Sequence, residues 1–274
     1  MSESYTSFAR VYDTFMDNVP YQEWADFMDT VLQKYGCFGK NLTANPLQDT
    51  EMEQALLSER NSVLDLGCGT GTLTELLADK GYDMIGIDNA EEMLEIAMEK
   101  RMQSGKDILY LLQDMREFEL YGTVGAVISV CDSLNYILDE EDMQKVFDLV
   151  NNYLYPGGIF VFDFNTVYKY ETVIGDTTIA ENREDCSFIW DNYYYEEEQI
   201  NEYELSLFIK ETDSDLYRKY QETHFQKAYD LETMKRLVEQ SGLEYVTAYD
   251  AFTKQLPTKE SERVYIIARE CGKK

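Results

Sequence analysis

Hydrophobic and polar residues follow two different periods along this chain, and each period predicts its own architecture. From residue 62 onward, short apolar runs alternate with stretches in which apolar residues recur every three or four positions. Runs that are apolar throughout predict strands buried on both faces, and the stretches between them predict amphipathic helices. The first period therefore predicts an α/β domain with a mostly parallel sheet that helices cover on both sides.

The predicted elements follow one another in a regular order. Strands are expected at 62–66, 82–88, 108–114, 125–131, 159–164, 245–252 and 263–270, and helices between them at 72–81, 90–102, 140–154 and 231–242. Two further helices are expected within residues 5–35, separated by Pro20 and ended by Gly36, followed by a loop at 36–49 and a short helix at 50–59. The Pro-Gly-Gly triplet at 156–158 predicts a turn into the fifth strand.

Near residue 179 the spacing of the apolar residues shortens to every second position. Residues 186–210 and 217–228 are rich in Tyr, Phe, Ile and Trp, with alternation in YELSLFI, and EEEQINE predicts a hairpin turn. This block predicts a small antiparallel sheet inserted into the α/β domain. The chain thus divides into N-terminal helices at 1–59, an α/β domain at 60–178 and 229–274, and an insert at 179–228.

The segment SVLDLGCGTG at residues 62–71 predicts a binding site. Its glycines follow a strand, and doubly wound sheets bind ligands beyond the carboxyl ends of their strands. A dinucleotide pattern would need glycine at position 72, which is Thr72, and no Gly-Lys-Ser/Thr follows for a phosphate-binding loop. The expected ligand is therefore nucleoside-like and is not held by its phosphates.

Three acidic residues lie where strands are expected to end. Asp88 can accept hydrogen bonds from both hydroxyls of a ribose, and Asp114 with the apolar Met115 can hold an adenine. Asp65, just before the glycines, either faces the cationic amino end of a ligand or buttresses the glycine loop. Together these acids suit a ligand that carries positive charge and no phosphate.

Three motifs, VLDLGCGTG, GIDNA and LLQDM, occur in this order and at a characteristic spacing. In them the chain resembles the class I S-adenosylmethionine-dependent methyltransferases over residues 60–165. The resemblance implies a Rossmann-like, doubly wound, mostly parallel seven-stranded sheet, methyltransferase activity and S-adenosyl-L-methionine as cofactor. It places these residues at the cofactor: Asp65, Gly67, Cys68, Gly69, Gly71, Asp88, Asn89, Asp114, Met115 and Val130.

A narrower resemblance rests on YTSFARVYDTFMDNVPYQEW near the N-terminus, CDSLNY at 131–136 and ETHFQKAYD at 222–230. These segments resemble a bacterial subfamily of methyltransferases that act on small molecules. The resemblance implies that the N-terminal helices close over the cofactor with Tyr12, or less strongly with Tyr5, because an aromatic face attracts a sulfonium. Alternatively, Tyr12 belongs to a packed stripe with Phe8 and Phe15.

Methyl transfer requires alignment of the nucleophile and exclusion of water, and a base only where the nucleophile must lose a proton. Candidate residues lie in the loop after the fourth strand: Asp132, Ser133, Asn135 and Tyr136. Asp132 can steer or deprotonate an amine, or it is a helix cap or turn residue. His224, the only histidine, is either a general base, by analogy, or a structural residue.

The insert is expected to form a lid that binds the acceptor. Its aromatic residues either line an acceptor pocket or supply the core of a very small sheet, and the core role is favoured for most of them. The residues concerned are Trp190, Tyr193, Tyr195 and Tyr220.

Composition narrows the range of partners. The 274 residues include 24 Lys and Arg against 53 Asp and Glu, and the formal charge of −29 repels phosphate backbones and anionic membranes. Five cysteines without CxxC spacing argue against a disulfide framework and a structural zinc, so no metal is predicted. No secretory signal and no apolar stretch of the ~20 residues that span a bilayer are apparent, so a cytoplasmic protein is expected.

Three functional hypotheses follow. The first is a methyltransferase that acts on the nitrogen or oxygen of a small-molecule acceptor. The second is a methyltransferase that acts on a protein or RNA; the charge argues against RNA but suits a basic protein. The third is a protein that binds S-adenosylmethionine without catalysis. No membrane partner is expected, nucleic acid is disfavoured, and a homodimer is left open.

Overall fold

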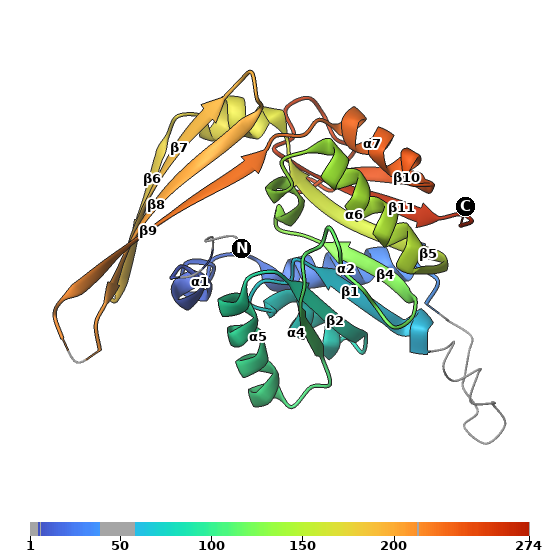
Figure 1. Ribbon diagram of the computed structural model, residues 1–274, viewed down its shortest axis with the longest axis horizontal. Coiled ribbons are helices and arrows are strands. Elements are labelled where there is room, and N and C mark those ends of the chain that lie inside the picture. Colours follow the sequence, from blue (N-terminus) through green and yellow to red (C-terminus); the bar gives the residue numbers. More distant parts are fainter. Residues whose placement is uncertain (1–4, 6, 39–57, 213, 274) are drawn as a thin grey trace.

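Two β-sheets organise the chain. The computed structural model describes residues 5, 7–38, 58–212 and 214–273. The strands are β1 (Ser62–Leu66), β2 (Asp83–Asp88), β3 (Leu109–Leu112), β4 (Val124–Ser129), β5 (Leu154–Asn165), β6 (Thr178–Asn182), β7 (Cys186–Tyr195), β8 (Ile200–Lys210), β9 (Tyr217–Lys227), β10 (Leu243–Asp250) and β11 (Arg263–Glu270). A seven-stranded sheet forms the main body, and a four-stranded sheet extends from one side of it (Figure 1).

The main sheet has the strand order β10-β11-β5-β4-β1-β2-β3. Strands β1 to β5 run parallel to one another, and β11 runs antiparallel to both β5 and β10. This sheet, together with the antiparallel order β6-β7-β8-β9 of the second sheet, confirms the expected α/β fold with an inserted antiparallel sheet. Because β1 lies between β2 and β4, the strand order reverses at its carboxyl end, where doubly wound sheets bind ligands.

Helices cover both faces of the main sheet. One face carries α2 (Tyr21–Tyr35), α4 (Thr72–Asp79) and α5 (Glu91–Ser104), and the other carries α6 (Glu140–Tyr153) and α7 (Leu231–Gln240). Strand β5 shows why its sequence is apolar throughout. Phe160 and Phe162 face the α6 side, whereas Ile159 and Val161 belong to the core on the α2 side. A strand covered on both faces has no position that tolerates a solvent-facing side chain.

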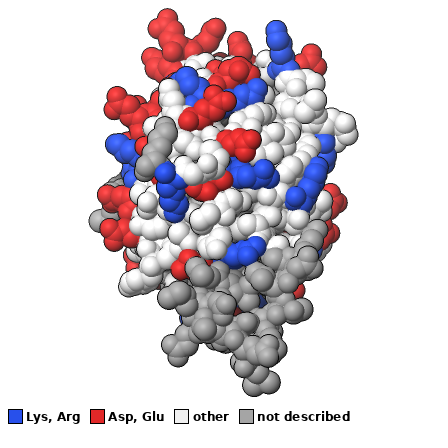
Figure 2. Space-filling view, turned by 90° about the vertical axis from the view of Figure 1, so that its right-hand side faces the viewer, with Lys and Arg blue, Asp and Glu red and all other residues white. Residues whose placement is uncertain are grey.

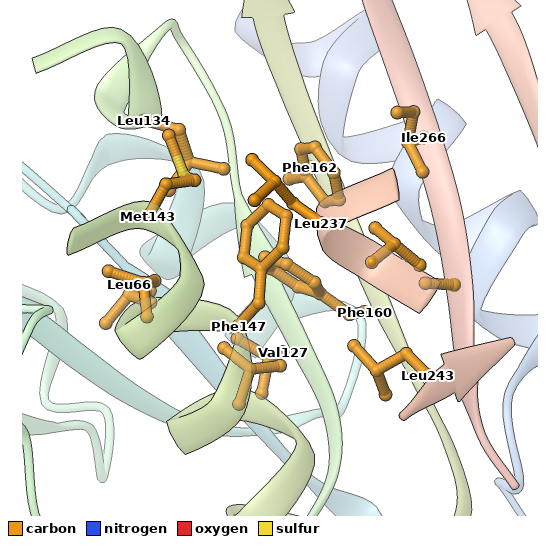
Figure 3. Packing of buried hydrophobic residues seen from close by; sticks show 14 of the residues in the cluster. Leu66, Val127, Leu134, Met143, Phe147, Phe160, Phe162, Leu237, Leu243 and Ile266 are labelled. Carbon is orange, nitrogen blue, oxygen red and sulfur yellow. The ribbon is translucent and has the colours of Figure 1, made fainter. Parts of the chain in front are cut away.

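Aromatic packing joins α6 to β5. The ring of Phe147 lies 5.5 Å from that of Phe160 and 5.1 Å from that of Phe162, between centroids (Figure 3). Leu237 of α7 and Ile266 of β11 close the same core cluster (Figure 3). The burial of these side chains holds the helical layer against the sheet.

The second sheet packs one face against α1 (Ala9–Phe15). Phe15 meets Phe188 edge-to-face with 4.8 Å between ring centroids. Trp190 and Tyr220 pack against this small core, as the favoured reading expected. Tyr193 and Tyr195 are 42% and 46% exposed, so for them both readings were wrong. Their side chains lie on the outer face of a sheet that has only one covered side.

Two features of the strands differ from expectation. The Pro-Gly-Gly triplet lies inside β5, because a register shift lets Leu154 to Ile159 pair with only Val124 to Ala126 of β4. A bulge therefore absorbs the predicted turn, with Gly157 at φ +76°. Strand β6 was not expected, since its residues are mostly exposed at a sheet edge. Most of the loop and helix expected over 36–59 lies at 39–57, outside the described residues; residues 58–61 are helical.

The surface shows no gathering of basic side chains on the face in Figure 2. Lys and Arg lie there one by one among acidic and uncharged residues (Figure 2). In the described part of the chain, no helix is long and apolar enough to cross a membrane.

Truncation of the aromatic core tests the packing of α6 on β5. Phe147→Ala removes a fully buried ring, and the lost burial and remaining cavity should lower the free energy of unfolding by about 3–5 kcal/mol. Urea denaturation followed by circular dichroism measures this change. Leu112→Ala, at a side chain 55% exposed on the edge strand β3, should stay within about 0.5 kcal/mol of the wild type. Equal losses in both variants would contradict the described core.

Candidate active site

A cavity of about 240 Å³ lies at the carboxyl ends of β1, β2, β3 and β4. At ~10–15 Å³ for each water molecule, it has room for a metabolite rather than an ion. All but one of the residues predicted to contact the cofactor line it: Tyr12, Asp65, Gly67, Cys68, Gly69, Asp88, Asn89, Asp114, Met115 and Val130. The topology thus brings together residues that lie more than a hundred positions apart in the sequence.

The glycine turn serves both the cavity and the packing around it. Gly69 has φ +54°, and a Cβ built there would meet nothing within 4 Å, so a ligand can approach its backbone. Gly71, which does not line the cavity, has φ +72° and lies against the Tyr110 ring and Ala97. Tyr110 of β3 and Ala97 of α5 leave no space for a side chain at this position. The glycine at 69 therefore leaves room for a ligand, and the glycine at 71 leaves room for the packing of α5 and β3.

Asp88 ties the end of β2 to the glycine turn. Its Oδ2 accepts a hydrogen bond from the Gly69 N–H at 2.7 Å, and its Oδ1 accepts one from the Ala90 N–H at 2.9 Å. Burial raises the pKa of the carboxyl, although these hydrogen bonds act in the opposite direction. Each oxygen keeps a lone pair for a further donor, so the group can also bind a ligand.

Asp65 is the most deeply buried acid of the site. It is 2% exposed, and its Oδ2 accepts a hydrogen bond from the Thr74 hydroxyl at 2.6 Å. Burial, with a smaller contribution from the charge of Asp88, raises the pKa of this carboxyl to about 7, although the hydrogen bond from Thr74 acts in the opposite direction. Asp65 therefore supports the first turn of α4 and also lines the cavity, and its contact with the amino end of a ligand stays a prediction.

Asp114 is held by its neighbour Arg116. The Arg116 N–H donates to Oδ1 at 2.8 Å, and its guanidinium forms a close ion pair with the same carboxylate. These hydrogen bonds hold the pKa of Asp114 below its ordinary value. Met115 lies beside the glycine turn, since its Cε would be 3.4 Å from a Cβ at Gly67. An acceptor and an apolar side chain thus border the same end of the cavity.

Aromatic side chains form the opposite wall, and they are Tyr5, Tyr12, Tyr21, Trp24 and Tyr136. Tyr12 also packs edge-to-face on Phe8 with 5.4 Å between ring centroids. The packing of Tyr12 with Phe8 is confirmed, and its contact with the cofactor stays a prediction that its place in the cavity wall supports. Sequence reasoning missed Tyr21 and Trp24, because the helical spacing of Trp24 assigned it to packing and nothing local singled out Tyr21.

The loop after β4 has an unusual backbone. Cys131 and Asp132 have φ of +64° and +55°, a region that side chains other than glycine seldom adopt. The buried Asp163 carboxylate fixes this turn by accepting the Cys131 N–H at 3.1 Å and the Asp132 N–H at 2.8 Å. Asp163 was not predicted; the single acid within the apolar run IFVFDF was the signal that could have found it.

Asp132 is held by partners outside the cavity. Its Oδ2 accepts a hydrogen bond from Gln226 Nε2 at 2.7 Å, and its Oδ1 forms a close ion pair with Arg263. It does not line the cavity. Its role as a catalytic residue stays a prediction, and the geometry fits the alternative of a turn residue better.

His224 lies one layer behind the cavity wall. It is 4% exposed and does not line the cavity itself. Its Nδ1 lies 3.3 Å from the Tyr136 hydroxyl, and its Nε2 lies 3.2 Å from Glu222 Oε2. Through Tyr136, which does line the cavity, His224 is connected to the site.

Comparison with known proteins identifies the family. A family model described as a methyltransferase domain matches residues 63–158. YqeM of Bacillus subtilis, whose name is that of a methyltransferase, is 33% identical over 267 residues, which cover 97% of each chain. A crystal structure of an S-adenosylmethionine-dependent methyltransferase from Clostridium acetobutylicum has a TM-score of 0.80 at 26% identity and covers 98% of this chain and 99% of that one. The chain belongs to the class I S-adenosylmethionine-dependent methyltransferases.

A more distant relative of this methyltransferase carries the name of its substrate. The dTDP-3-amino-3,4,6-trideoxy-alpha-D-glucopyranose N,N-dimethyltransferase of Streptomyces venezuelae is 30% identical over 125 residues. The match covers 46% of this chain and 51% of that enzyme.

The cavity of this methyltransferase fits the cofactor of its family. Open space at Gly69 leaves room for a ligand against the backbone. Among the described residues, no Lys or Arg forms an ion pair with Asp65 or Asp88. Two buried acids without a cationic partner in this part of the chain suit a ligand that brings positive charge. The described residues contain no group of three His, Cys, Asp or Glu side chains arranged for a metal ion.

The raised pKa of Asp65 makes a prediction about stability. The folded state keeps a proton on this carboxyl up to about pH 7, whereas the unfolded chain releases it near pH ~3.9. Stability should therefore fall as pH rises between these values, by on the order of 4 kcal/mol. Asp65→Asn removes the titrating carboxyl, so the stability of the variant should not fall in this way. Relative to the wild type, the unfolding free energy of the variant should therefore increase from pH 4 to pH 7.

Urea denaturation at several pH values measures that difference. Asp215→Asn, at an exposed position in the turn between β8 and β9, should keep a constant difference from the wild type. A difference for Asp65→Asn that does not change with pH would show that the carboxyl is ionised in the folded protein at all these pH values.

Proposed function

We propose that this enzyme transfers the methyl group of S-adenosylmethionine to the nitrogen of a small-molecule amine. The observation that carries the proposal is a single cavity shared by the glycine turn, the buried acids and the aromatic wall. Residues that suit the cofactor and aromatic residues that suit an amine acceptor therefore face the same space. The name of the Streptomyces venezuelae relative, an N,N-dimethyltransferase of an amino sugar, supports an amine acceptor.

The residues at the strand ends would hold the cofactor. Asp88, already fixed by Gly69 and Ala90, would accept the ribose hydroxyls with its remaining lone pairs. Asp114 and Met115 would border the adenine, and Asp65 would face the cationic amino end. The open backbone at Gly69 would let the methionine part approach the turn. When bound, S-adenosylmethionine supplies an activated methyl group on a sulfonium.

The aromatic wall would hold the acceptor. Rings of Tyr and Trp attract cations through their electron-rich faces, which suits the sulfonium of the cofactor and the methylated ammonium that forms when the amine lone pair attacks. The limited volume of about 240 Å³ must serve cofactor and acceptor together, which favours a small molecule over a protein segment. The wall excludes water from the site, so the nucleophile keeps its lone pair available.

The N-terminal segment would act as the inner cover of this site and the second sheet as an outer lid. Tyr5 and Tyr12 lie between the cavity and the second sheet, whose strand β9 holds the segment through Glu222. At the other end of α1, Asp13 accepts a hydrogen bond from the Thr70 hydroxyl at 2.7 Å and pairs with Lys100 at 2.6 Å. These contacts at both ends support a closing role for residues 5–15.

Cofactor binding tests the first half of the proposal. Calorimetric titration of the purified protein with S-adenosylmethionine and S-adenosylhomocysteine should detect binding of both. Asp88→Asn keeps the size of the side chain but removes its charge, so both affinities should fall about 10- to 150-fold, as expected for charged hydrogen bonds. Asp83→Asn, at an exposed position at the other end of β2, should bind like the wild type. A folded protein that binds neither ligand would overturn the proposal.

Transfer of a labelled methyl group tests the acceptor. The panel should contain nucleotide-linked amino sugars, simple amines, hydroxyl compounds, a lysine-rich protein and RNA. We expect label on amines alone. Label on the protein or RNA alone would contradict the small-molecule proposal, and cofactor binding without transfer to any member would favour the third hypothesis of a non-catalytic binder.

A further inference from the structure

A row of four side chains runs from the cavity into the second sheet. The Tyr5 and Tyr136 hydroxyl oxygens lie 2.6 Å apart, and Tyr136 Oη lies 3.3 Å from His224 Nδ1. His224 Nε2 lies 3.2 Å from Glu222 Oε2. Both tyrosines line the cavity, whereas His224 and Glu222 are only 4% and 6% exposed. The row thus connects the site to a buried acid on β9.

The carboxylate at the buried end sets the direction of the hydrogen bonds. Burial alone would raise the pKa of Glu222, but hydrogen bonds from His224 and from the Phe8 and Ser7 N–H groups outweigh it and lower the pKa. An ionised carboxylate only accepts, so Nε2 of His224 carries the hydrogen. In the neutral imidazole, Nδ1 then accepts from the Tyr136 hydroxyl, whose oxygen in turn accepts from Tyr5.

The hydroxyl hydrogens of both tyrosines and the Nε2 hydrogen of His224 therefore all point toward Glu222. The oxygen of Tyr5 keeps a lone pair at the end of the row that faces the cavity. Such a row can take up a proton at one end and pass it along by a shift of each hydrogen to the next atom. Burial raises the pKa of both tyrosine hydroxyls well above its ordinary value. Neither tyrosine thus holds a lasting negative charge, which suits residues that transmit a proton.

We propose that Tyr5, Tyr136, His224 and Glu222 form a proton relay that removes the proton of the acceptor nitrogen during methyl transfer. The inference rests on the proposed function. As the nitrogen lone pair forms the bond to the methyl carbon, the carbon–sulfur bond breaks and its electron pair stays on sulfur. The nitrogen's proton passes to Tyr5 Oη, the hydrogens of Tyr5 and Tyr136 move on by one position, and His224 Nδ1 is protonated. The imidazolium is then stabilised by the Glu222 carboxylate.

The same carboxylate links the relay to closure of the N-terminal segment. Glu222 Oε2, which faces His224, also accepts the Tyr5 N–H at 2.9 Å. Tyr5 has φ +64°, a costly conformation for a residue with a side chain, and this contact holds it there. Docking of the segment therefore places the Tyr5 hydroxyl at the open end of the row. The relay is complete only in the closed arrangement, when water is excluded.

Glu222, Tyr136, Tyr5 and Tyr203 surround the His224 ring. Glu222 faces the ring from the same strand, Tyr136 faces it from η1 (Ser133–Tyr136), and Tyr5 meets it edge-to-face with 4.9 Å between ring centroids. Tyr203 of β8 lies opposite His224 in the strand register. Glu222 is the one charged group among these four residues at neutral pH, so the imidazolium gains a partner and no competing cation.

Nuclear magnetic resonance can determine which ring nitrogen of His224 carries the hydrogen, and no acceptor is needed for this. The spectrum is simple to assign because the chain has one histidine. In the ¹⁵N-histidine-labelled protein, we expect a pyridine-type shift at Nδ1 and a pyrrole-type shift at Nε2 in the neutral form. Tyr136→Phe should move the Nδ1 signal, since it removes the donor at that atom. Tyr193→Phe, on the exposed face of the second sheet, should leave it in place. A neutral histidine with its hydrogen on Nδ1 would overturn the relay.

Turnover with the amine identified by the panel tests the proton path. His224→Gln, Tyr136→Phe and Tyr5→Phe should each lower kcat about 100-fold or more at neutral pH. The KM for S-adenosylmethionine should stay unchanged, and the acidic limb of the pH–rate profile should disappear in His224→Gln. Tyr193→Phe should match the wild type. A histidine that is merely structural would leave the pH profile unchanged and would instead raise KM or lower stability.

Calorimetry separates the two proposals. If the wild type binds S-adenosylhomocysteine but the histidine carries its hydrogen on Nδ1, or if kcat is unaffected in the three variants, the relay alone is wrong. If the folded wild type does not bind S-adenosylhomocysteine, the proposed function is wrong and the relay has no reaction to serve.

Discussion

Burial of the parallel strands on both faces is the constraint on which the rest of this structure depends. Helices cover both sides of the main sheet, so polar groups that must remain reachable can lie only at the ends of its strands. Asp65, Asp88 and Asp163 all lie at or near carboxyl ends, next to the point where the strand order reverses. The fold thus separates an apolar interior from a single polar edge, and the cavity occupies that edge.

The acids at this edge are costly to bury, and backbone N–H groups offset much of that cost. Asp88 accepts two of them and shapes the glycine turn, and Asp163 accepts two more and holds the loop after β4 in its strained conformation. Asp65 accepts a hydrogen bond from the Thr74 hydroxyl, and burial raises its pKa to about 7. Asp163 faces Arg263 instead of the cavity. Asp88 lines the cavity and forms no ion pair with Lys or Arg in the described part of the chain, so its negative charge suits a cationic cofactor.

The N-terminal segment is one of several connections between the two sheets, beside the contacts of β9 with Asp132 and Asn135. Apolar side chains of α1 form the core of the second sheet, with Phe15 on Phe188, while Asp13 bonds to the glycine turn. Glu222 anchors the beginning of the segment from β9. The beginning of the segment is held by Glu222 of the second sheet, and its other end is held by the glycine turn of the main sheet. Both sets of contacts together place its tyrosines at the cavity.

The sequence by itself determined the parts of this protein that rest on local periodicity. Buried strands are apolar throughout, a helix has a period of 3.6, and a glycine turn must follow its strand, so β1, β2, β11 and the residues at their ends could be located within a residue or two. Only the tertiary structure decided what depends on pairing over long distances. It turned Asp132 toward Arg263 and Gln226, placed His224 behind Tyr136, exposed Tyr193 and Tyr195, and absorbed the Pro-Gly-Gly triplet in a bulge. The directions of the Asp132 and His224 side chains are set by partners far away in the sequence, 94 and 131 residues for Asp132 and 88 residues for His224, and no local pattern encodes them.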